Sequence, residues 1–469
     1  MAFDDSDLAA LRDLADPKSV VPEDAKQPHL EEWRGRWPGE SPLILAPGST
    51  DELSRIMAEA YARGIAIVPQ GGNTGLVGGG VANGEVIIST KRMRAVREVA
   101  PQGFTMTVEA GVTLAEAQEL AAEHGRLFPL SIGAEGTANI GGVLSTNAGG
   151  VHVLRYGNAR DLVLGLEVVL PDGRVWHGLN ALRKNNTGYD LKHLFMGGEG
   201  TLGIITAAVL KLYPQPAEEE TALLAVPSAD AAVRLLSMAQ ERSGGQLGSF
   251  ELMSASMVEL VLDAFSDLER PLDSDAPFYV LAEFTSGRKG TLRSVVEELL
   301  GAALEEGLVL DGTLAADGRQ AEQLWSLRHN ATEAMKHDGA PCVKCDVSVP
   351  IAAIPEFLTR ADAAVRDLEP GARIIAFGHM GDGNIHYDIL GPESGDHQAF
   401  AACMGAFERR VHDVIAACGG SISAEHGIGQ LKRDELEERK DPVELEMMRA
   451  IKRTLDPRGL MNPGKLLRT

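Results

Sequence analysis

The stretch Pro69-Gln70-Gly71-Gly72-Asn73-Thr74-Gly75 decides the fold of this chain. It follows a predicted strand, Ile65–Val68, and its successive backbone N–H groups are suited to cradling a pyrophosphate. No Gly-Lys-Ser/Thr follows, so it is not a Walker loop, and its glycine spacing differs from the Rossmann fingerprint. Taken alone, the stretch is equally consistent with a flexible β-turn, and both interpretations stay open at this point.

Two further glycine-rich stretches favour the ligand-binding interpretation. One is Gly133–Gly150, which contains Gly141-Gly142, and the other is Gly197-Gly198-Glu199-Gly200. A large flat cofactor that carries a diphosphate needs several surfaces of backbone donors and close backbone approach. The first half of the chain therefore predicts a site for such a cofactor.

Composition excludes several classes of protein. The chain has 469 residues, which predicts two or three domains. Its 44 basic and 67 acidic side chains give a net charge of −23, which argues against nucleic acid or anionic lipid as a partner. The N-terminus has no apolar core of a signal peptide, and no apolar run is long enough to cross a bilayer. Four cysteines make no disulfide framework, and Cys342-Val343-Lys344-Cys345 is interpreted as a coincidence on a strand, so a reducing cytoplasm is expected.

Helix and strand patterns divide the chain near Pro214–Glu220, where two prolines precede three glutamates. A capping box at Ser49–Glu52 opens a helix that stops at Gly64, and Pro171-Asp172-Gly173 predicts a hairpin. Alternating elements beyond the boundary predict a second α+β domain. The other predicted helices are Leu8–Leu14, Thr113–His124, Ala229–Gln240 and Thr291–Glu306, and the other predicted strands are Val86–Ser89, Thr105–Glu109, Leu162–Leu170, Arg174–His177, Ile204–Leu212 and Phe278–Phe284.

A second chemical motif is Gly378-His379-Met380-Gly381-Asp382-Gly383-Asn384-Ile385-His386, which Glu425-His426 follows later in the chain. Two imidazoles on either side of a Gly/Asp/Asn turn can face one point across a hairpin. A glutamate from a later segment would complete a His, His, Glu ligand set for a divalent metal with one position open. A tight turn with two incidental histidines is the alternative, and the spacing alone leaves both open.

The glycine stretches, the histidine motif and the closing Leu455–Lys465 together resemble the vanillyl-alcohol-oxidase/para-cresol-methylhydroxylase flavoprotein superfamily. From Trp33 to Lys465 the chain resembles its FAD-linked D-2-hydroxyacid dehydrogenases. The resemblance implies an α+β fold, with a two-subdomain FAD-binding domain of the vanillyl-alcohol-oxidase type, an α+β cap (substrate) domain and a C-terminal helical segment. The implied ranges are 1–215 for the FAD-binding domain (including an N-terminal preamble, 1–41), 216–415 for the cap domain, and 416–469 for the C-terminal segment that completes the active site and the FAD domain.

The same resemblance implies which residues hold FAD. The Pro69–Gly75 loop and the Gly133–Gly150 region would bind the pyrophosphate and the ring, while the stretch from Gly203 would lie beside the adenine half or the ring edge. The Pro69–Gly75 loop contains no histidine or cysteine, so FAD is expected to be non-covalent. The predicted cofactor-binding residues are Pro69, Gly71, Gly72, Asn73, Thr74, Gly75, Gly133, Thr137, Gly141, Gly142, Asn147, Gly203, Ile205 and Asn462.

The histidine motif also gains a role from the resemblance. His379, His386 and Glu425 are similar to the metal ligands of these dehydrogenases, with Zn²⁺ or another divalent metal as the ion. A metal bound to the α-hydroxyl and carboxylate of the substrate would acidify the hydroxyl. His426 would contact the substrate and take the hydroxyl proton as the catalytic base. Hydride would pass from the α-carbon to the flavin and leave a 2-oxo acid.

Arg328, Thr332 and Lys344 form a candidate substrate clamp. Arg328 and Thr332 are four residues apart on a predicted helix and are expected to share a face, and Lys344 lies on the strand that follows. Arg and Lys gathered in an acidic protein are suited to holding a carboxylate, whereas ordinary surface charge is the alternative. The three residues resemble those that hold the distal carboxylate in the D-2-hydroxyglutarate branch of the family, which favours a dicarboxylate substrate.

Asp388 departs from the family pattern, which often has Asn near the substrate carboxylate. An ionised Asp would repel that carboxylate unless it is paired or turned away. The Arg328-to-Lys344 interval is also one residue longer than in the closest pattern. The predicted reaction is the FAD-dependent, metal-assisted oxidation of D-2-hydroxyglutarate to 2-oxoglutarate, and D-lactate, D-malate or glycolate remain alternative substrates.

Other functional classes stay open. A zinc hydrolase would use the His, His, Glu set alone and would leave the glycine stretches unexplained. An electron-transfer flavoprotein subunit would work only within a complex, and an oxidase would release peroxide. The chain has no cysteine set for an iron–sulfur cluster, so electrons are expected to leave through another protein, such as electron-transfer flavoprotein, or a quinone. A homodimer is common in the family.

Overall fold

The computed structural model describes residues 4–468, which divide into two compact units. Unit 1 comprises the chain up to Gly149, Gly157–Gln215 and the segment from His426 onward. Unit 2 comprises Gly150–Tyr156 and Pro216–Glu425. Each unit therefore includes a segment that is distant in sequence from its main part. Within residues 4–468, no helix combines the length and apolarity that a membrane crossing requires.

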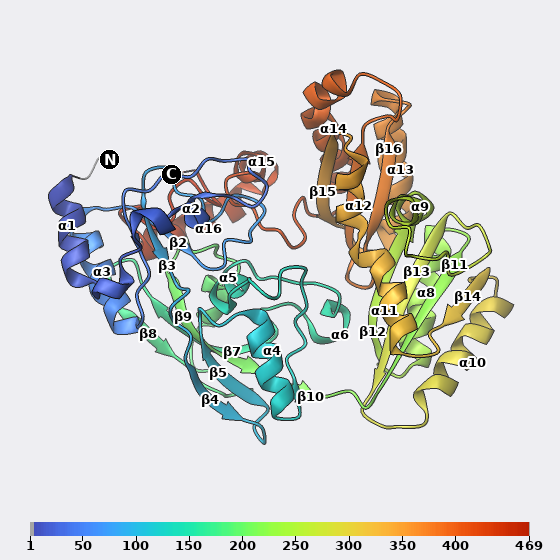
Figure 1. Cartoon of the computed structure of the whole chain (residues 1–469), viewed down its shortest axis with the longest axis horizontal. Helices are drawn as coiled ribbons and strands as arrows, with labels where there is room; N and C mark the ends of the chain where they lie inside the picture. The colour runs from blue at the N-terminus through green and yellow to red at the C-terminus, as the bar shows by residue number, and fades with distance from the viewer. Residues whose placement is uncertain (1–3, 469) are drawn as a thin grey trace. The chain divides into compact units, whose positions relative to one another are not determined.

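Unit 1 contains three sheets (Figure 1). Its strands are β1 (Ile44–Leu45), β2 (Ile67–Gln70), β3 (Val86–Ser89), β4 (Val96–Ala100), β5 (Thr105–Glu109), β6 (Arg126–Leu127), β7 (Val163–Val169), β8 (Val175–Gly178), β9 (Ile204–Lys211) and β10 (Tyr213–Pro214). The five-stranded sheet is antiparallel with the order β4-β5-β9-β7-β8, the three-stranded sheet is parallel with the order β1-β3-β2, and β10 pairs with β6. Its helices are α1 (Asp5–Leu14), α2 (Gln27–Leu30), α3 (Thr50–Arg63), α4 (Leu114–Glu123), α5 (Ile140–Ser145), α7 (Lys192–Phe195), α15 (Arg433–Arg439) and α16 (Pro442–Leu455), and short 3-10 turns lie at Pro17–Ser19 and Glu23–Ala25.

Capping residues set the ends of the first long helix, α3. The Ser49 side chain accepts a hydrogen bond from the Glu52 N–H at 3.2 Å, and Gly64 ends the helix in a left-handed conformation (φ 75°). The predicted capping box is only half formed, because the Glu52 carboxylate accepts from the N–H groups of Gly48 and Asp16 instead. The side chain of Glu52 thereby ties the N-terminal segment to α3.

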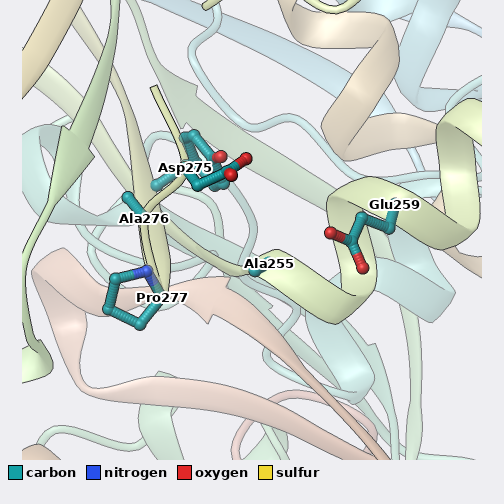
Figure 2. A pocket seen from close by; sticks show the side chains of 6 residues that line it. Ala255, Glu259, Asp275, Ala276 and Pro277 are labelled. Atoms are coloured by element: carbon teal, nitrogen blue, oxygen red, sulfur yellow. The ribbon is translucent and has the colours of Figure 1, made fainter. Parts of the chain in front are cut away.

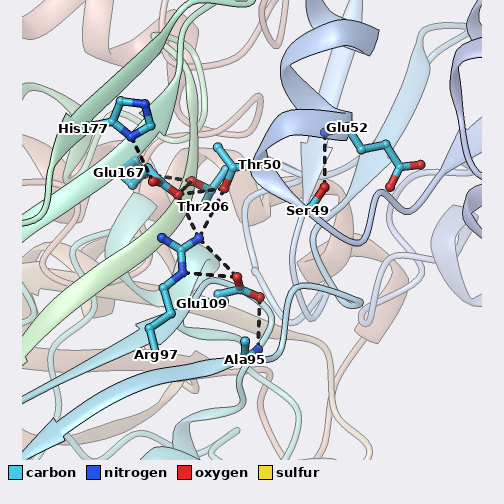
Figure 3. Close-up of polar contacts among 9 residues, drawn as sticks. All are labelled: Ser49, Thr50, Glu52, Ala95, Arg97, Glu109, Glu167, His177 and Thr206. Atoms are coloured by element: carbon cyan, nitrogen blue, oxygen red, sulfur yellow. Dashed lines mark hydrogen bonds and ion pairs between the residues drawn. The ribbon is translucent and has the colours of Figure 1, made fainter.

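A buried carboxylate, Glu167, links α3 to the five-stranded sheet (Figure 3). It accepts hydrogen bonds from Thr50 Oγ1 at 2.7 Å, Thr206 Oγ1 at 2.9 Å and Arg97 Nη2 at 2.9 Å, and His177 Nδ1 lies 3.1 Å from its second oxygen. Burial alone would raise the pKa of Glu167, but Arg97 and the two hydroxyl groups lower it to about 2. The carboxylate is therefore ionised and fully paired in the folded protein.

The C-terminal segment completes the three-stranded sheet of unit 1. Met461 forms a parallel bridge with Ile67, and the Asn462 N–H donates to the Ile67 carbonyl at 2.7 Å. The Lys452 ammonium donates to the Met461 carbonyl at 2.7 Å from α16. These contacts make the last residues a structural part of the same unit as the Pro69–Gly75 loop.

Unit 2 is built on one seven-stranded sheet. Its strands are β11 (Glu218–Val226), β12 (Leu247–Ser254), β13 (Phe278–Ser286), β14 (Asp311–Leu314), β15 (Cys342–Ser348), β16 (Arg373–His379) and β17 (Asn384–Leu390). The order is β14-β11-β13-β12-β16-β17-β15, and all neighbours are antiparallel. Its helices are α6 (Val153–Tyr156), α8 (Ala229–Arg242), α9 (Ala255–Ala264), α10 (Leu292–Glu305), α11 (Gly318–His329), α12 (Ala331–Asp338), α13 (Ile354–Leu368) and α14 (His397–Ala417), with 3-10 turns η3 (Ile351–Ala353) and η4 (Met380–Asp382).

Two apolar cores cover the two faces of this sheet. Helices α8, α10, α13 and α14 pack on one face, and α9, α11 and α12 pack on the other. Strand residues alternate between the cores, as the period of two requires. Cys345 belongs to the first core and Cys342 to the edge of the second, so the two cysteines point to opposite faces. The C-x-x-C pattern therefore does not present both cysteines on one face of the sheet.

The predicted α+β class is confirmed, and most long elements lie where the sequence predicts them. The predicted strands Val86–Ser89 and Thr105–Glu109 match β3 and β5 residue for residue. The Pro171–Gly173 hairpin forms between β7 and β8, with Gly173 at φ 86°. One helix prediction is wrong. Arg328 and Thr332 lie on separate helices, because Asn330, with φ −82° and ψ −2°, is both the C-cap of α11 and the N-cap of α12.

Candidate functional site

The histidine motif forms a hairpin between β16 and β17. His379 ends β16, η4 makes the turn, and His386 lies in β17. Gly383 adopts φ 87° in the turn, where an added Cβ would lie 2.3 Å from the Val349 carbonyl oxygen, so only glycine fits. The two imidazole rings have their centroids 5.8 Å apart at an interplanar angle of 76°. The predicted hairpin and the approach of its two histidines are confirmed.

Strand register gathers further polar residues beside these histidines. Residues directly opposite each other in an antiparallel pair project to the same face of the sheet. Across β12, β16, β17 and β15, the register therefore collects polar side chains on the face that α9, α11 and α12 cover. The opposed pairs are Glu251 with His379, Asp346 with His386, and Lys344 with Asp388.

The carboxylate of Glu425 faces both histidines. Its Oε2 lies 3.9 Å from His379 Nε2, and its Oε1 lies 3.5 Å from His386 Nε2. Potential ligand atoms of Asp346, His386, Glu425 and the adjoining His426 all lie within 4.8 Å of one another. The structure thus places two of the three predicted ligands, His386 and Glu425, in one group with Asp346, and the third, His379, approaches this group through its 3.9 Å contact with Glu425. The sequence analysis missed Asp346, although the alternation of β15 from Lys344 points to it.

The electrostatics of this cluster suit a cation. Burial raises the pKa of Glu425 to about 7; the nearby His379 opposes this shift, and the charge of Asp346 adds to it. Burial likewise raises the pKa of Asp382 to about 6. Carboxylates that resist ionisation in a buried cluster are stabilised by a bound cation. Two imidazoles with two carboxylates are a donor set that fits Zn²⁺.

Arg328 is held in place by two contacts within unit 2. Its Nε donates to Glu251 Oε2 at 2.7 Å, and its guanidinium carbon lies 4.7 Å from the centre of the Phe377 ring. The residue is only 8% exposed, so the surface-charge alternative is wrong for Arg328. Its orientation is fixed before any ligand binds.

The other proposed clamp residues are on neighbouring elements. Lys344 is half-buried on β15, directly opposite Asp388, which is 4% exposed on β17. This register places the Lys344 ammonium beside Asp388, the residue that differs from the Asn of the family pattern. A charge pair between the two would reduce the repulsion between Asp388 and a substrate carboxylate. Thr332 is half-buried in the first turn of α12. The three clamp residues therefore come from α11, α12 and β15.

The three glycine-rich stretches of unit 1 pack closely against one another. An added Cβ at Gly72 would lie 2.1 Å from the Thr137 carbonyl oxygen, and one at Gly200 would lie 2.4 Å from Pro69 Cγ. Gly200 also has φ 68°, a conformation that favours glycine. The stretches are separated in sequence but form one surface of close backbone approach, as a dinucleotide site requires.

Buried polar atoms without a partner lie near this surface. Within residues 4–468 they include Asn139 Oδ1, Thr90 Oγ1 and Asn462 Oδ1. Asn139 precedes the Gly141-Gly142 pair, and Asn462 Nδ2 donates to the Gly79 carbonyl at 3.0 Å. Buried polar groups normally find partners. The unpaired atoms and the glycine surface together fit a bound polar cofactor such as FAD.

The remaining predicted FAD residues have diverse surroundings. Asn73 and Asn147 adopt positive φ and hold neighbouring loops, since Asn73 Nδ2 donates to the Glu31 carbonyl at 2.7 Å and Asn147 Oδ1 accepts from the Arg160 N–H at 2.9 Å. Ile205 is buried within β9. Gly71 lies on the glycine surface, since its added Cβ would lie 3.5 Å from Gly142, and one at Gly141 would lie 2.8 Å from Ala110 Cβ. An added Cβ at Gly75 or Gly133 has nothing within 4 Å. Thr74 precedes Gly75 in the same loop, and Gly203 lies just before β9.

Glu199 is a second residue that the sequence analysis missed. Its carboxylate oxygens accept hydrogen bonds from the backbone N–H groups of Ile428 and Gly429, each at 2.7 Å. Asn462 Nδ2 donates to its carbonyl oxygen at 2.8 Å. Glu199 adopts φ 49° in the third glycine stretch. The available signal in the sequence was a charged residue, Glu199, within the glycine stretch Gly197–Gly200. The contacts anchor the segment that follows His426 within unit 1.

A cavity in unit 2 contains none of the predicted site residues (Figure 2). Its volume is about 380 Å³, and Glu259 and Asp275 supply its charged groups. A neighbouring cavity of about 620 Å³ shares Glu259. Two carboxylates and no opposing cation make the first cavity unsuited to an anionic substrate.

Comparison with known proteins identifies the domains of the chain. Residues 215–466 match the family described as FAD linked oxidases, C-terminal domain, and residues 41–178 match the FAD binding domain family. The chain is 39% identical to the mitochondrial D-2-hydroxyglutarate dehydrogenase of Bos taurus, over 99% of this chain and 84% of that protein. It is 38% identical to D-2-hydroxyglutarate dehydrogenase of Xanthomonas citri pv. viticola, over 93% of this chain and 92% of that protein.

Solved structures support the fold. The chain matches p-cresol methylhydroxylase with a TM-score of 0.75 at 16% identity, covering 100% of this chain and 98% of that one. It matches alkyldihydroxyacetonephosphate synthase with a TM-score of 0.73 at 18% identity, covering 98% of this chain and 85% of that one. The predicted vanillyl-alcohol-oxidase type of fold is thereby confirmed.

Proposed function

The chain belongs to the FAD-linked D-2-hydroxyacid dehydrogenases of the vanillyl-alcohol-oxidase/para-cresol-methylhydroxylase superfamily, and we propose that it oxidises D-2-hydroxyglutarate to 2-oxoglutarate. It is an FAD-dependent dehydrogenase of a small 2-hydroxy acid. The observation that carries the choice of a dicarboxylate is the presence of two cations at the sheet face of the histidine hairpin. Arg328 of α11 is held there by Glu251, and Lys344 projects from β15 on the same face. Relatives named for D-2-hydroxyglutarate support the same substrate.

The proposal includes a divalent metal, with Zn²⁺ as the candidate. His379, His386 and Glu425 would hold it, and Asp346 stands close enough to contribute. When bound, the metal supplies Lewis-acid polarisation of the substrate hydroxyl, and FAD supplies the hydride acceptor. His426 would take the hydroxyl proton on a ring nitrogen, because an imidazole exchanges protons near neutral pH.

Substrate selection would depend on the residues around the distal carboxylate. Arg328 is pre-oriented by Glu251 and can donate to a carboxylate from its two Nη groups. Lys344 would add a second charge-assisted contact and Thr332 a hydroxyl. A monocarboxylate such as D-lactate lacks the group that these residues would hold, so the site would discriminate against it.

The experiment that tests the proposal is an anaerobic titration of the flavoprotein with D-2-hydroxyglutarate, D-malate and D-lactate, each with and without a chelator. Rapid bleaching of the flavin by D-2-hydroxyglutarate, abolished by the chelator, is expected. Bleaching by D-lactate alone would contradict the roles of Thr332 and Lys344. Bleaching that is indifferent to the chelator would contradict the metal. A protein that binds no flavin would return a zinc hydrolase to consideration.

We propose an electron-transfer flavoprotein or a quinone as the electron acceptor, and a cytoplasmic homodimer as the working form. One relative, 34% identical, is named a D-2-hydroxyglutarate–pyruvate transhydrogenase in Saccharomyces cerevisiae. Pyruvate therefore belongs among the acceptors to assay with the reduced enzyme, beside electron-transfer flavoprotein, a quinone analogue and oxygen. Light scattering would test the dimer, and cell fractionation would test the compartment.

A further inference from the structure

Glu251 is a fully buried carboxylate in β12 that touches two parts of the candidate site at once. Its exposed fraction is 0%. Its Oε2 accepts from Arg328 Nε at 2.7 Å, and its Oε1 lies 2.6 Å from His379 Nδ1. One carboxylate therefore joins a proposed substrate-binding arginine to a proposed metal ligand.

The contact with Glu251 determines which nitrogen of His379 carries a proton. Glu251 Oε2 accepts from the guanidinium of Arg328, which is always charged, and its other oxygen lies 2.6 Å from His379 Nδ1. A carboxylate that is paired with a guanidinium accepts hydrogen bonds, so Nδ1 of His379 donates. In the neutral ring, Nε2 then carries the lone pair, and Nε2 is the atom that faces Glu425.

The strand register makes this contact a built-in feature of the sheet. Glu251 and His379 are directly opposed in the β12–β16 pair, so their side chains are neighbours on one face. Metal-binding histidines commonly donate their second ring N–H to a carboxylate, which fixes the tautomer and the ring orientation. Glu251 has the position and the charge for that role.

We infer that Glu251 is a positioning residue that sets the ligand atom of His379 and the orientation of Arg328 together. The inference rests on the metal and substrate sites of the proposed function. Glu251 accepts from Nε of Arg328, and the guanidinium carbon lies 4.7 Å from the centre of the Phe377 ring, so two contacts hold the guanidinium in place. Loss of Glu251 would therefore weaken metal binding and dicarboxylate binding in one step.

The test measures Zn²⁺ affinity of the FAD-loaded protein by competition with a chromophoric chelator, in wild type and in Glu251→Gln. A Gln amide keeps the shape but can satisfy only one of the two donors. We expect metal affinity to fall about 10–100-fold. KM for D-2-hydroxyglutarate should rise more than KM for D-lactate, while the FAD content is unchanged.

Glu167→Gln is the matched control. Glu167 is also a buried strand carboxylate with an arginine and a histidine as partners, but it lies in unit 1 (Figure 3). Its substitution should lower the free energy of unfolding and leave Zn²⁺ affinity unchanged. If both variants lose metal to the same extent, the loss reflects general destabilisation and the inference is wrong.

Glu251→Asp is the second variant, for the case in which Glu251→Gln does not fold. It keeps the charge in the core but draws the carboxylate back by one methylene, so a smaller loss of metal affinity is expected. Wild-type Zn²⁺ affinity in either purified variant would overturn the inference while leaving the proposed function intact. A wild-type enzyme that oxidises D-2-hydroxyglutarate without binding Zn²⁺ would overturn the proposed metal and the inference together.

Discussion

The backbone N–H of Glu425 donates a hydrogen bond to Oδ2 of Asp346 at 3.0 Å. The same carboxylate accepts from Asn384 Nδ2 at 3.0 Å through its other oxygen. Asp346 is buried on β15, opposite His386. Asp346 therefore fixes the backbone of Glu425, one proposed metal ligand, and lies directly opposite His386, another proposed ligand.

Asp346→Asn is expected to lower metal affinity and kcat by about 10–100-fold, because outer contacts of metal ligands contribute that much in other sites. Metal content after dialysis and steady-state kinetics would measure both. Asp362→Asn is the control, since Asp362 accepts from the Tyr387 hydroxyl at 2.8 Å on the opposite side of the same sheet. Unchanged metal content in Asp346→Asn would contradict a role for Asp346 in metal binding.

Lys344→Met is expected to reduce kcat/KM for D-2-hydroxyglutarate by roughly 10–100-fold, the value of one lost charge-assisted hydrogen bond. The value for D-lactate should change little, because lactate has no distal carboxylate. Comparing the two substrates with one enzyme preparation provides the internal control. An equal loss for both would show that Lys344 supports the fold or the chemical step instead.

Glu199→Ala is expected to destabilise unit 1 by about 2–6 kcal/mol, since one buried and one part-buried N–H group would each lose their acceptor. Those donors are Ile428 and Gly429, which follow His426 closely, so kcat should also fall. Denaturant unfolding of the FAD-loaded enzyme measures the first effect. Glu199→Gln retains one acceptor and should lose less stability. A wild-type free energy of unfolding in Glu199→Ala would contradict the anchoring role.

Much of the site could be predicted because its signals are local in sequence. The two histidines flank a turn in which Gly383 adopts a positive φ, and this pattern predicts a hairpin without reference to the rest of the chain. The glycine stretches carry the same kind of local signal. Arg328 and Lys344 came from resemblance, because nothing in their immediate sequence distinguishes them from surface charge.

The partners of Glu251 and Glu199 could not be predicted for a common reason. Each acts through partners far away in sequence, such as His379, which pairs with Glu251 only through the β12–β16 register. The local sequence pattern does not determine which distant segments pair as strands, nor in which register. The break at Asn330 was missed for the opposite reason, because residues on both sides favour helix and the interruption spans a single residue.

Stability should depend on Glu167 at acid pH. Its pKa is lowered from 4.5 to about 2, so its contribution is fully present above pH 4.5 and is lost as the pH falls toward 2. The shift corresponds to about 3 kcal/mol. Unfolding free energies of wild type and Glu167→Gln should therefore converge at low pH. A difference that stays constant from pH 7 to pH 2 would contradict this linkage.

Gly72→Ala is expected to reduce FAD affinity, because its Cβ would lie 2.1 Å from the Thr137 carbonyl and would separate two of the glycine stretches. Flavin absorbance after gel filtration measures the FAD that is retained. Gly287→Ala is the control, since an added Cβ there has nothing within 4 Å. Full FAD retention in Gly72→Ala would show that this contact is not needed for cofactor binding.

The bridge between Ile67 and Met461 has a consequence for the order of folding during synthesis. A chain emerging from the ribosome presents all of unit 2 once Glu425 has left the exit tunnel, whereas unit 1 still lacks Asn462 and α16. Domains generally fold as units once their chain is available. Unit 2 can therefore mature first, whereas unit 1 cannot be complete until Met461 is available to pair with Ile67.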